Sequence, residues 1–127
     1  MTSEWSPTYT RVFADDDGET HFEDVSLPAE RRSSPTGAVE AVAPLEAEGL
    51  AFRLVLEEAS DTDPHNAPRR LLIVQIDGTV EVEVSDGEKR QFGPGSVLLV
   101  EDTTGKGHLT RNLTGRPRST LIATLPT

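Results

Sequence analysis

The chain has 127 residues, a length that corresponds to one ordinary domain rather than to two independent cores. Its 22 acidic and 12 basic side chains give a formal net charge of −10 at pH 7, which excludes a nucleic-acid binder, because the phosphate backbone is recognised largely by Lys and Arg. There is no cysteine, so disulfides, thiol catalysis and cysteine-based zinc sites are excluded as well.

The start of the chain, Met1–Trp5, lacks the basic region and following apolar stretch that mark a secretory signal. No apolar run further along approaches the ~20 residues that a membrane helix needs. We therefore expect a cytoplasmic protein with no membrane partner.

Residues 1–49 are expected to hold N-terminal strands followed by a long loop or arm. Asp17-Gly18 is typical of a hairpin turn, because Gly accepts the positive φ of tight turns, and the next segment, Thr20–Glu23, is interpreted as a strand. Residues 26–48 contain three prolines and are rich in Ala, Ser and Glu. We expect this segment to be a long loop or arm, with at most one helical turn near Leu45–Glu48.

From residue 50 onward the sequence has the pattern of short strands separated by tight turns. Five segments carry strand signals: 50–57, 71–76, 80–84, 97–100 and 120–125. The first places Leu50, Phe52, Leu54 and Leu56 on one face, and the third alternates Val with Glu, as in a strand with one buried face. The turn signals between them are Asp77-Gly78, Asp86-Gly87 and Gly93-Pro94-Gly95. This combination predicts an all-β sandwich or barrel.

Residues 65–112 resemble the two motifs of the cupin family. The first motif reads Gly, five residues, His-x-His, three or four residues, Glu, six residues, Gly; the second reads Gly, five residues, Pro-x-Gly, two residues, His, three residues, Asn. The matching positions are His65, Gly78, Gly105, His108 and Asn112. The resemblance implies a cupin-type double-stranded β-helix, or jelly-roll barrel, as a single domain of residues 1–127 with its barrel core at 50–127. It also implies that His65 and His108 face the barrel interior.

The chain departs from the cupin pattern at the metal ligands. Metal-binding members of the family hold their ion with three His and one Glu, but two of these positions are Ala67 and Leu71 here, and neither can coordinate. His21 would complete a three-histidine site with the motif histidines if it points into the barrel, with Glu23 on the same strand face. The alternative is that His21 is a surface or edge-strand residue. The cofactor is therefore either a divalent transition metal (Fe, Mn, Ni, Cu or Zn) or none tightly bound.

Counting by twos from the first motif histidine predicts the side chains that line the barrel: Ala67, Arg69, Leu71, Ile73 and Gln75. Apolar cavities with a few polar groups are typical of small-molecule sites, and Arg69 would bind a carboxylate or a similar anion. The alternative places Arg69 on the surface beside Arg70, and Gln75 in a hydrogen bond with a neighbouring strand.

The first functional hypothesis is a protein that binds a small, anionic, partly apolar organic ligand through Arg69, Gln75, His65 and His108. The second is a cupin enzyme. It would be either a metal-assisted oxygenase or isomerase, or a metal-free epimerase or cyclase with His65 or His108 as general base. The resemblance further implies a homodimer, because jelly rolls of this family pair through sheet edges or exchanged N-terminal strands. Residues 26–48 would serve that exchange.

Overall fold

The computed structural model describes residues 4–56 and 60–127. These residues form strands, turns and loops with no helix among them, which confirms the predicted all-β class. The strands are β1 (Thr8–Ala14), β2 (Thr20–Ser26), β3 (Ala29–Ser34), β4 (Gly37–Val42), β5 (Gly49–Val55), β6 (Leu71–Asp77), β7 (Val80–Val84), β8 (Lys89–Phe92), β9 (Val97–Val100), β10 (His108–Asn112) and β11 (Arg118–Thr124). Within the described residues, no helix has the length and apolar character needed to cross a membrane.

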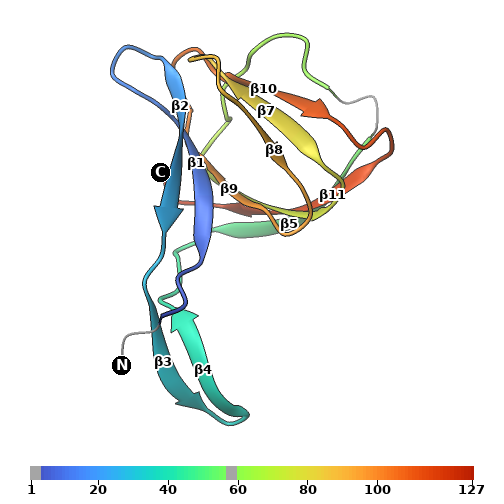
Figure 1. The fold of residues 1–127 in the computed structure, drawn as a ribbon. Helices are drawn as coiled ribbons and strands as arrows, with labels where there is room; N and C mark the ends of the chain where they lie inside the picture. The colour runs from blue at the N-terminus through green and yellow to red at the C-terminus, as the bar shows by residue number, and fades with distance from the viewer. Residues whose placement is uncertain (1–3, 57–59) are drawn as a thin grey trace.

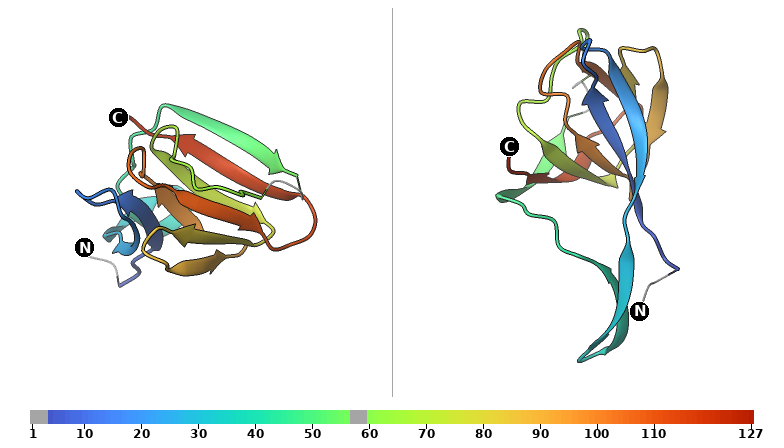
Figure 2. Two further views of the ribbon diagram at one scale, coloured as in Figure 1. Left: turned by 90° about the horizontal axis from the view of Figure 1, so that it is seen from above. Right: turned by 90° about the vertical axis from the view of Figure 1, so that its left-hand side faces the viewer.

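The strands form two facing sheets and one separate hairpin (Figures 1 and 2). The larger sheet has six strands in the order β2-β1-β9-β6-β11-β5, and the smaller has three in the order β10-β7-β8. The N-terminal strands belong to the larger sheet, since β1 pairs in parallel with β9 and antiparallel with β2. Two facing sheets of this kind are consistent with the β-barrel or jelly-roll class.

The hydrophobic core lies between the two sheets. Val80, Val82 and Val84 of β7 are buried while the two glutamates between them are partly exposed, so the predicted alternation is confirmed. Phe22 of β2 and Phe92 of β8 close the core where the sheets meet, with ring centroids 6.0 Å apart. The apolar area that the core side chains remove from water supplies the main driving force that holds the two sheets together.

The predicted turns are also confirmed. Gly18, Gly78 and Gly87 have φ values of 85°, 85° and 98°, a backbone region that only Gly adopts readily. Each follows an Asp. Gly18 and Gly87 lie in the β1–β2 and β7–β8 hairpin connections, and Gly78 lies in the connection from β6 of the larger sheet to β7 of the smaller one. Gly78 has a second role, because a Cβ there would lie 2.5 Å from the Cβ of Arg118.

Residues 26–48 form an arm, as expected, but the arm is a β-hairpin rather than a loop. Strands β3 and β4 pair over their full length and project away from the two sheets (Figure 1). The helical turn allowed for near Leu45–Glu48 does not form, since these residues are irregular. The prolines lie outside the strands, with Pro28 before β3, Pro35 in the turn and Pro44 after β4. Proline cannot donate a hydrogen bond within a ladder, and here the prolines delimit the strands without preventing them.

The alternation predicted for residues 50–57 is present in β5, although Glu57 lies outside the described residues. The apolar face of this strand points to solvent: Leu50, Phe52 and Leu54 are 68%, 80% and 62% exposed. Arg53 and Val55 of the opposite face line the space between the sheets, and at the end of the strand Leu54 and Leu56 border it as well. The orientation of β5 therefore leaves large apolar side chains on the molecular surface.

Candidate functional site

A cavity of about 590 Å³ lies between the two sheets. Most of its wall is aliphatic, with side chains such as Leu71, Ile73 and Leu98 from the larger sheet and Val82 from the smaller one. The polar groups on the wall include His65, His108, Asp61, Gln75, Arg53 and Arg118. An apolar cavity of this size with a few polar groups has the character of a small-molecule site.

The two histidines of the cupin-like motifs lie side by side on the cavity wall. Their backbones form an isolated antiparallel bridge, in which each N–H donates to the other residue's carbonyl at 3.0 and 2.9 Å. Their ring centroids are 4.8 Å apart at an interplanar angle of 50°. Gly107 permits this approach, because a Cβ at that position would lie 2.5 Å from the carbonyl oxygen of His65.

Each imidazole is held by a carboxylate. Nδ1 of His108 lies 2.5 Å from Oδ2 of Asp102, and both side chains are buried. Nδ1 of His65 lies 3.1 Å from Oδ2 of Asp61, which also accepts a hydrogen bond from the backbone N–H of Thr110 at 2.8 Å. A carboxylate acceptor at Nδ1 places a proton on that nitrogen and leaves Nε2 to face a bound molecule.

Arg118, the first residue of β11, is the one Lys or Arg that is buried among the described residues, at 6% exposure. Its Nη1 donates to Oε1 of Gln75 over a long 3.4 Å, while its Nε has no hydrogen-bond partner in the described part of the chain. Burial lowers the pKa of the Arg118 guanidinium, the charge of Arg53 lowers it further, and Asp61 opposes both. The group stays protonated, because the guanidinium of arginine does not lose its proton in proteins.

Further polar atoms beside Arg118 lack a partner. Nε2 of Gln75 and Oγ1 of Thr120 are buried and make no hydrogen bond within residues 4–56 and 60–127. The two residues face one another across strands β6 and β11. Buried polar groups are normally hydrogen-bonded, so these atoms and Nε of Arg118 form a polar patch on the cavity wall with unused donor capacity.

The structure places Arg69 outside the cavity, contrary to the expected alternation. Its Nη2 contacts Oε2 of Glu48 at 2.5 Å and the carbonyl of Leu125 at 3.0 Å. The reason is local, because residues 66–70 are not in a strand and β6 begins only at Leu71. From there the alternation holds, and Leu71, Ile73 and Gln75 all line the cavity as expected.

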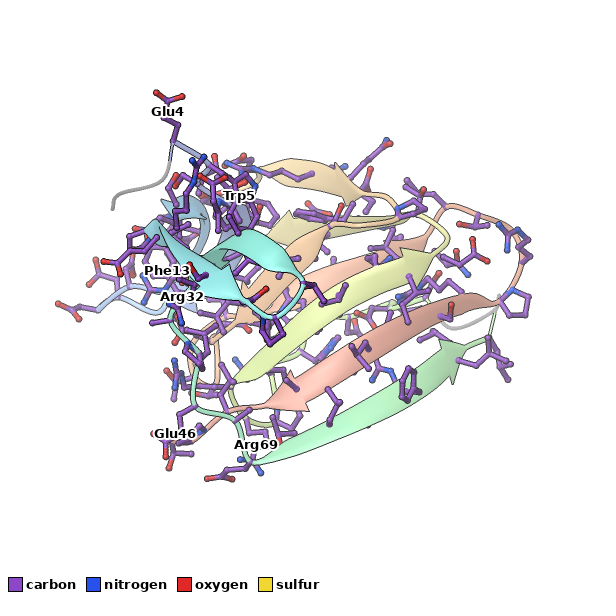
Figure 3. All side chains as sticks on the ribbon, turned by 90° about the horizontal axis from the view of Figure 1, so that it is seen from below. Glu4, Trp5, Phe13, Arg32, Glu46 and Arg69 are labelled. Atoms are coloured by element: carbon purple, nitrogen blue, oxygen red, sulfur yellow. The ribbon has the colours of Figure 1, made fainter. Side chains whose placement is uncertain are left out.

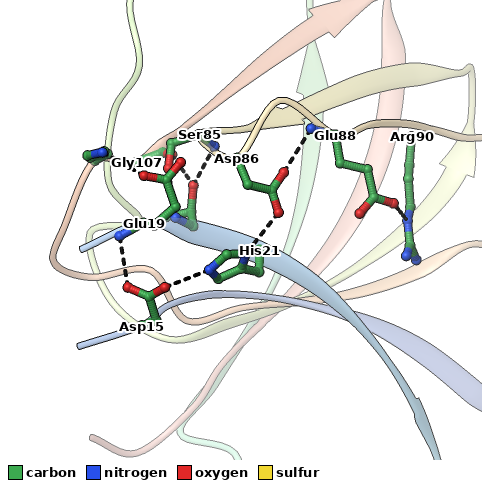
Figure 4. Close-up of polar contacts among 10 residues, drawn as sticks. Asp15, Glu19, His21, Ser85, Asp86, Glu88, Arg90 and Gly107 are labelled. Carbon is green, nitrogen blue, oxygen red and sulfur yellow. Dashed lines mark hydrogen bonds and ion pairs between the residues drawn. The ribbon is translucent and has the colours of Figure 1, made fainter. Parts of the chain in front are cut away.

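His21 also lies away from the two cavity histidines. Its ring is held between Oδ2 of Asp15 at 2.7 Å and Oδ2 of Asp86 at 2.8 Å (Figure 4). These two hydrogen bonds raise the pKa of His21. Glu23 is on the surface too, 3.5 Å from Arg11. His21 thus joins the β1–β2 turn to the β7–β8 turn.

The donor set does not fit a metal ion. Ala67 and Leu71 are on the cavity wall but carry no donor atom, and His21 is not there to replace them. Within the part of the chain that the structure describes, no group of three or more His, Asp or Glu side chains has an arrangement that could hold a metal. On the cavity wall, the carboxylate beside the two histidines is Asp61, and it is paired with Nδ1 of His65. Two histidines supply fewer ligands than metal sites in proteins use.

Sequence reasoning missed four polar groups of the cavity region: Asp61, Asp102, Arg53 and Arg118. A signal existed for Arg118, since counting back by twos from the apolar Ile122 leads through Thr120 to Arg118 on the same face of β11. No comparable signal existed for Asp61 and Asp102, because both lie in irregular segments. Asp61 and Asp102 can hold the two imidazoles only because the backbone bridge places His65 and His108 beside them.

No protein-family model matches the chain, and a search of curated proteins finds no similar one. The geometry and the charges of the cavity are therefore the basis on which a function can be proposed.

Proposed function

We propose that the protein is a small cupin-type barrel that binds a small, partly apolar organic carboxylate in the cavity between its sheets. The observation that carries this proposal is the buried guanidinium of Arg118, which forms no ion pair with a carboxylate among the described residues. A buried charge without a counter-charge is unfavourable. A carboxylate on the ligand would supply the missing partner.

The chemistry of the wall selects the class of ligand. The planar fork of an arginine matches a carboxylate in a bidentate pair, and the amide Nε2 of Gln75 offers one more donor beside it. The aliphatic remainder of the wall favours an apolar body on the same molecule. The two histidines would contact a second polar group on that body, through the ring nitrogens that face the cavity.

Calorimetric titration of the protein with small monocarboxylates, each paired with its neutral primary amide, tests the proposal. The acids are expected to bind and the amides to bind at least about tenfold more weakly. Arg118→Gln is expected to weaken binding of the acid by at least about 30-fold, because a buried charge-assisted pair is worth ~2–5 kcal/mol. Arg69→Gln is the matched control and is expected to bind like the wild type. Equal affinity of the Arg118 and Arg69 variants would refute the proposal.

A second candidate is a metal-free enzyme that moves a proton on the bound acid, as in an epimerisation or a cyclisation. The observation that favours it is the buried pair of His108 and Asp102, at 2.5 Å. A carboxylate at Nδ1 orients the imidazole and leaves Nε2 free to accept a proton from a substrate.

Solvent exchange tests this candidate. Acids found to bind are incubated with the protein in D₂O, and deuterium incorporation at carbon is followed by NMR. Exchange that is lost in His108→Gln, while the acid still binds, would support an enzyme. Binding without exchange in the wild type, for every acid that binds, would leave the non-catalytic binder as the function.

A further inference from the structure

Two arginines line the cavity, and they come from neighbouring strands of the larger sheet. Arg118 begins β11, and Arg53 lies in β5. Arg53 is opposite Thr120, which is two residues along β11 from Arg118, so the two arginines are diagonal neighbours on one face of the sheet. The Cα atoms of such neighbours are about 7–8 Å apart, which is less than the combined reach of two arginine side chains. The two guanidinium groups therefore serve one region of the cavity.

Neither of these arginines is neutralised by an ion pair. Most basic side chains of the described residues pair with an acid, but within residues 4–56 and 60–127 Arg53 and Arg118 do not. Burial lowers the pKa of Arg118, and the positive charge of Arg53 lowers it further, because like charges in one region repel. A pair of cations in a cavity attracts negative charge into it. Two negative charges would be needed to balance both groups.

A carboxylate does line the cavity, but it stands on the side of the smaller sheet. Asp61 accepts a hydrogen bond from the backbone N–H of Thr110 in β10 and contacts Nδ1 of His65. It acts on the pKa of Arg118 through its charge alone, against the effects of burial and of Arg53. A ligand carboxylate in the cavity would be repelled by Asp61 and attracted by the arginines. The acidic groups of a ligand are therefore directed to the larger sheet.

The two arginines differ in depth. Arg118 is 6% exposed, whereas Arg53 is exposed to solvent although it also lines the cavity. Strand β5 is at the edge of the larger sheet, and Leu54 and Leu56, which are 62% and 52% exposed, border the cavity there. The cavity thus opens to solvent at the end of β5, with Arg118 inside and Arg53 at the mouth.

This difference in depth selects two separate carboxylates over one doubly charged group. Each guanidinium fork matches one planar carboxylate in a bidentate pair. Nη1 of Arg118 donates to Oε1 of Gln75 inside the cavity, so an anion on the Arg118 guanidinium lies deeper than Arg53. A single phosphate-like group at that depth would leave Arg53 unpaired. Two carboxylates on adjacent carbon atoms of a ligand could reach both arginines.

We propose that the ligand is a short dicarboxylate of the succinate type with an apolar substituent, whose inner carboxylate binds Arg118 and whose outer carboxylate binds Arg53 at the mouth. This inference rests on the proposed function, because Arg118 holds a carboxylate in both. Arg53 is then the residue that distinguishes a diacid from a monoacid. The substituent lies against the aliphatic wall that includes Ile73 and Leu98.

Calorimetric titration at fixed ionic strength tests the assignment with butylsuccinate and benzylsuccinate, each compared with its two monoamides. The wild type is expected to bind each diacid about tenfold more tightly than the tighter monoamide, which is the lower end of what hydrogen bonds to charged groups contribute. Arg53→Gln is expected to abolish this preference and to bind the monoamide like the wild type. Arg118→Gln is expected to weaken the diacid and the monoamide alike.

Arg32→Gln is the matched control, because it removes the same charge outside the cavity. Arg32 is an exposed residue of β3, on the hairpin that projects from the sheets (Figure 3). This variant is expected to keep the wild-type preference for the diacid. Circular dichroism checks that every variant retains the wild-type strand content.

The outcomes separate this inference from the proposed function. The role of Arg53 would be overturned, with the proposed function intact, if the monoamides bind through Arg118 but the diacid preference is absent, persists in Arg53→Gln or is lost equally in Arg32→Gln. Failure of every acid to bind, or monoamide binding that is unchanged in Arg118→Gln, would overturn both.

Butylphosphonate and benzylphosphonate test the choice of two carboxylates. Each places its negative charge on a single group and is expected to bind more weakly than the corresponding diacid. Tighter binding of the phosphonate than of the diacid, with loss of that affinity in Arg53→Gln, would show that one group occupies both arginines. That result would overturn the dicarboxylate as the ligand class.

Discussion

Asp102 and His108 form a buried pair in which Oδ2 of the carboxylate lies 2.5 Å from Nδ1 of the imidazole. Asp102 has no solvent exposure and His108 has 8%. Asp102 lies near the start of the connection that follows β9, and His108 begins β10, so the pair joins the larger sheet to the smaller one at the cavity. It therefore serves both the stability of the fold and the orientation of a cavity side chain.

Asp102→Asn is expected to lower the free energy of unfolding by about 1–3 kcal/mol, because it removes the charged acceptor of a buried hydrogen bond. Asp61→Asn is the matched control. Asp61 holds His65 in the same way but is more exposed, so we expect a loss of less than about 1 kcal/mol. Urea denaturation at neutral pH measures both. Equal losses would show that burial of the Asp102 pair contributes nothing.

Arg118→Met is expected to stabilise the ligand-free protein by about 1 kcal/mol. The substitution replaces a buried charge that lacks a carboxylate partner with an apolar side chain of similar length, and such replacements are often stabilising. Arg70→Met is the comparison, because Nε of Arg70 lies 2.7 Å from Oε2 of Glu101; we expect it to lose stability slightly. Thermal unfolding of the two variants shows whether Arg118→Met gains stability while Arg70→Met loses it. A destabilised Arg118→Met would show that other groups in the protein already offset the cost of burying the guanidinium charge.

The His21 cluster is expected to make stability depend on pH within a defined window. The pKa of His21 is raised by its bonds to Asp15 and Asp86, so its stabilising contribution is complete below the ordinary value of 6.5 and disappears as pH rises through the raised value. The pKa of each carboxyl is lowered, so their contribution is present above 3.8 and disappears as pH falls through the lowered values. The cluster is therefore most stabilising between about pH 4 and 6.5.

The measurement is the melting temperature of the wild type and of His21→Ala from pH 2 to 9. The difference between the two proteins is expected to be largest near pH 5 and to shrink toward both ends of the range. A difference that is constant across the range would mean that the ring contributes through packing, such as its contact with Phe13, and not through its charge.

Gly107→Ala is expected to destabilise the protein more than Gly87→Ala. Both positions have a positive φ, of 77° and 98°, so both variants carry the conformational strain of a non-glycine residue there, about 1 kcal/mol. The Cβ at 107 would also lie 2.5 Å from the carbonyl of His65, whereas the Cβ at 87 meets nothing within 4 Å. Urea denaturation measures the loss of stability in each variant, and the difference between the two losses is the steric cost at residue 107. Changed NMR signals of the His65 and His108 rings are expected only for Gly107→Ala.

Local patterns were enough to predict most of the strands and turns. The Val-Glu alternation of β7 and the Asp-Gly turns depend on residues next to one another in the chain, and these features are present as expected. The arm at residues 26–48 was harder, because its Ala, Ser and Glu have low strand propensity. Its prolines were interpreted as signs of a loop, although they stand at the ends of β3 and β4 and not within them.

The cavity was predicted only where a regular strand carries the pattern. Leu71, Ile73 and Gln75 share a face of β6 and line the cavity, while Arg69 precedes the strand and turns to Glu48. The motif positions of His65 and His108 predicted that both face the interior, and both line the cavity. Nothing in those motifs indicated the carboxylates that hold them. His21 shares a strand with the buried Phe22 yet is paired at the surface.

The sequence by itself determined the all-β class, the positions of most strands and turns, and the alternation of side chains along each strand, because these depend on neighbouring residues. Only the tertiary structure decided which side of each strand faces the cavity and which charges meet. Strand β5 is at the edge of the larger sheet, and its face with Arg53 and Val55 lines the cavity. The face with Leu50 and Phe52 is therefore the one that is exposed to solvent. Arg118 became a buried cation without an ion pair because packing placed Gln75 in hydrogen-bond reach of its guanidinium, while Asp61 acts on it only through its charge.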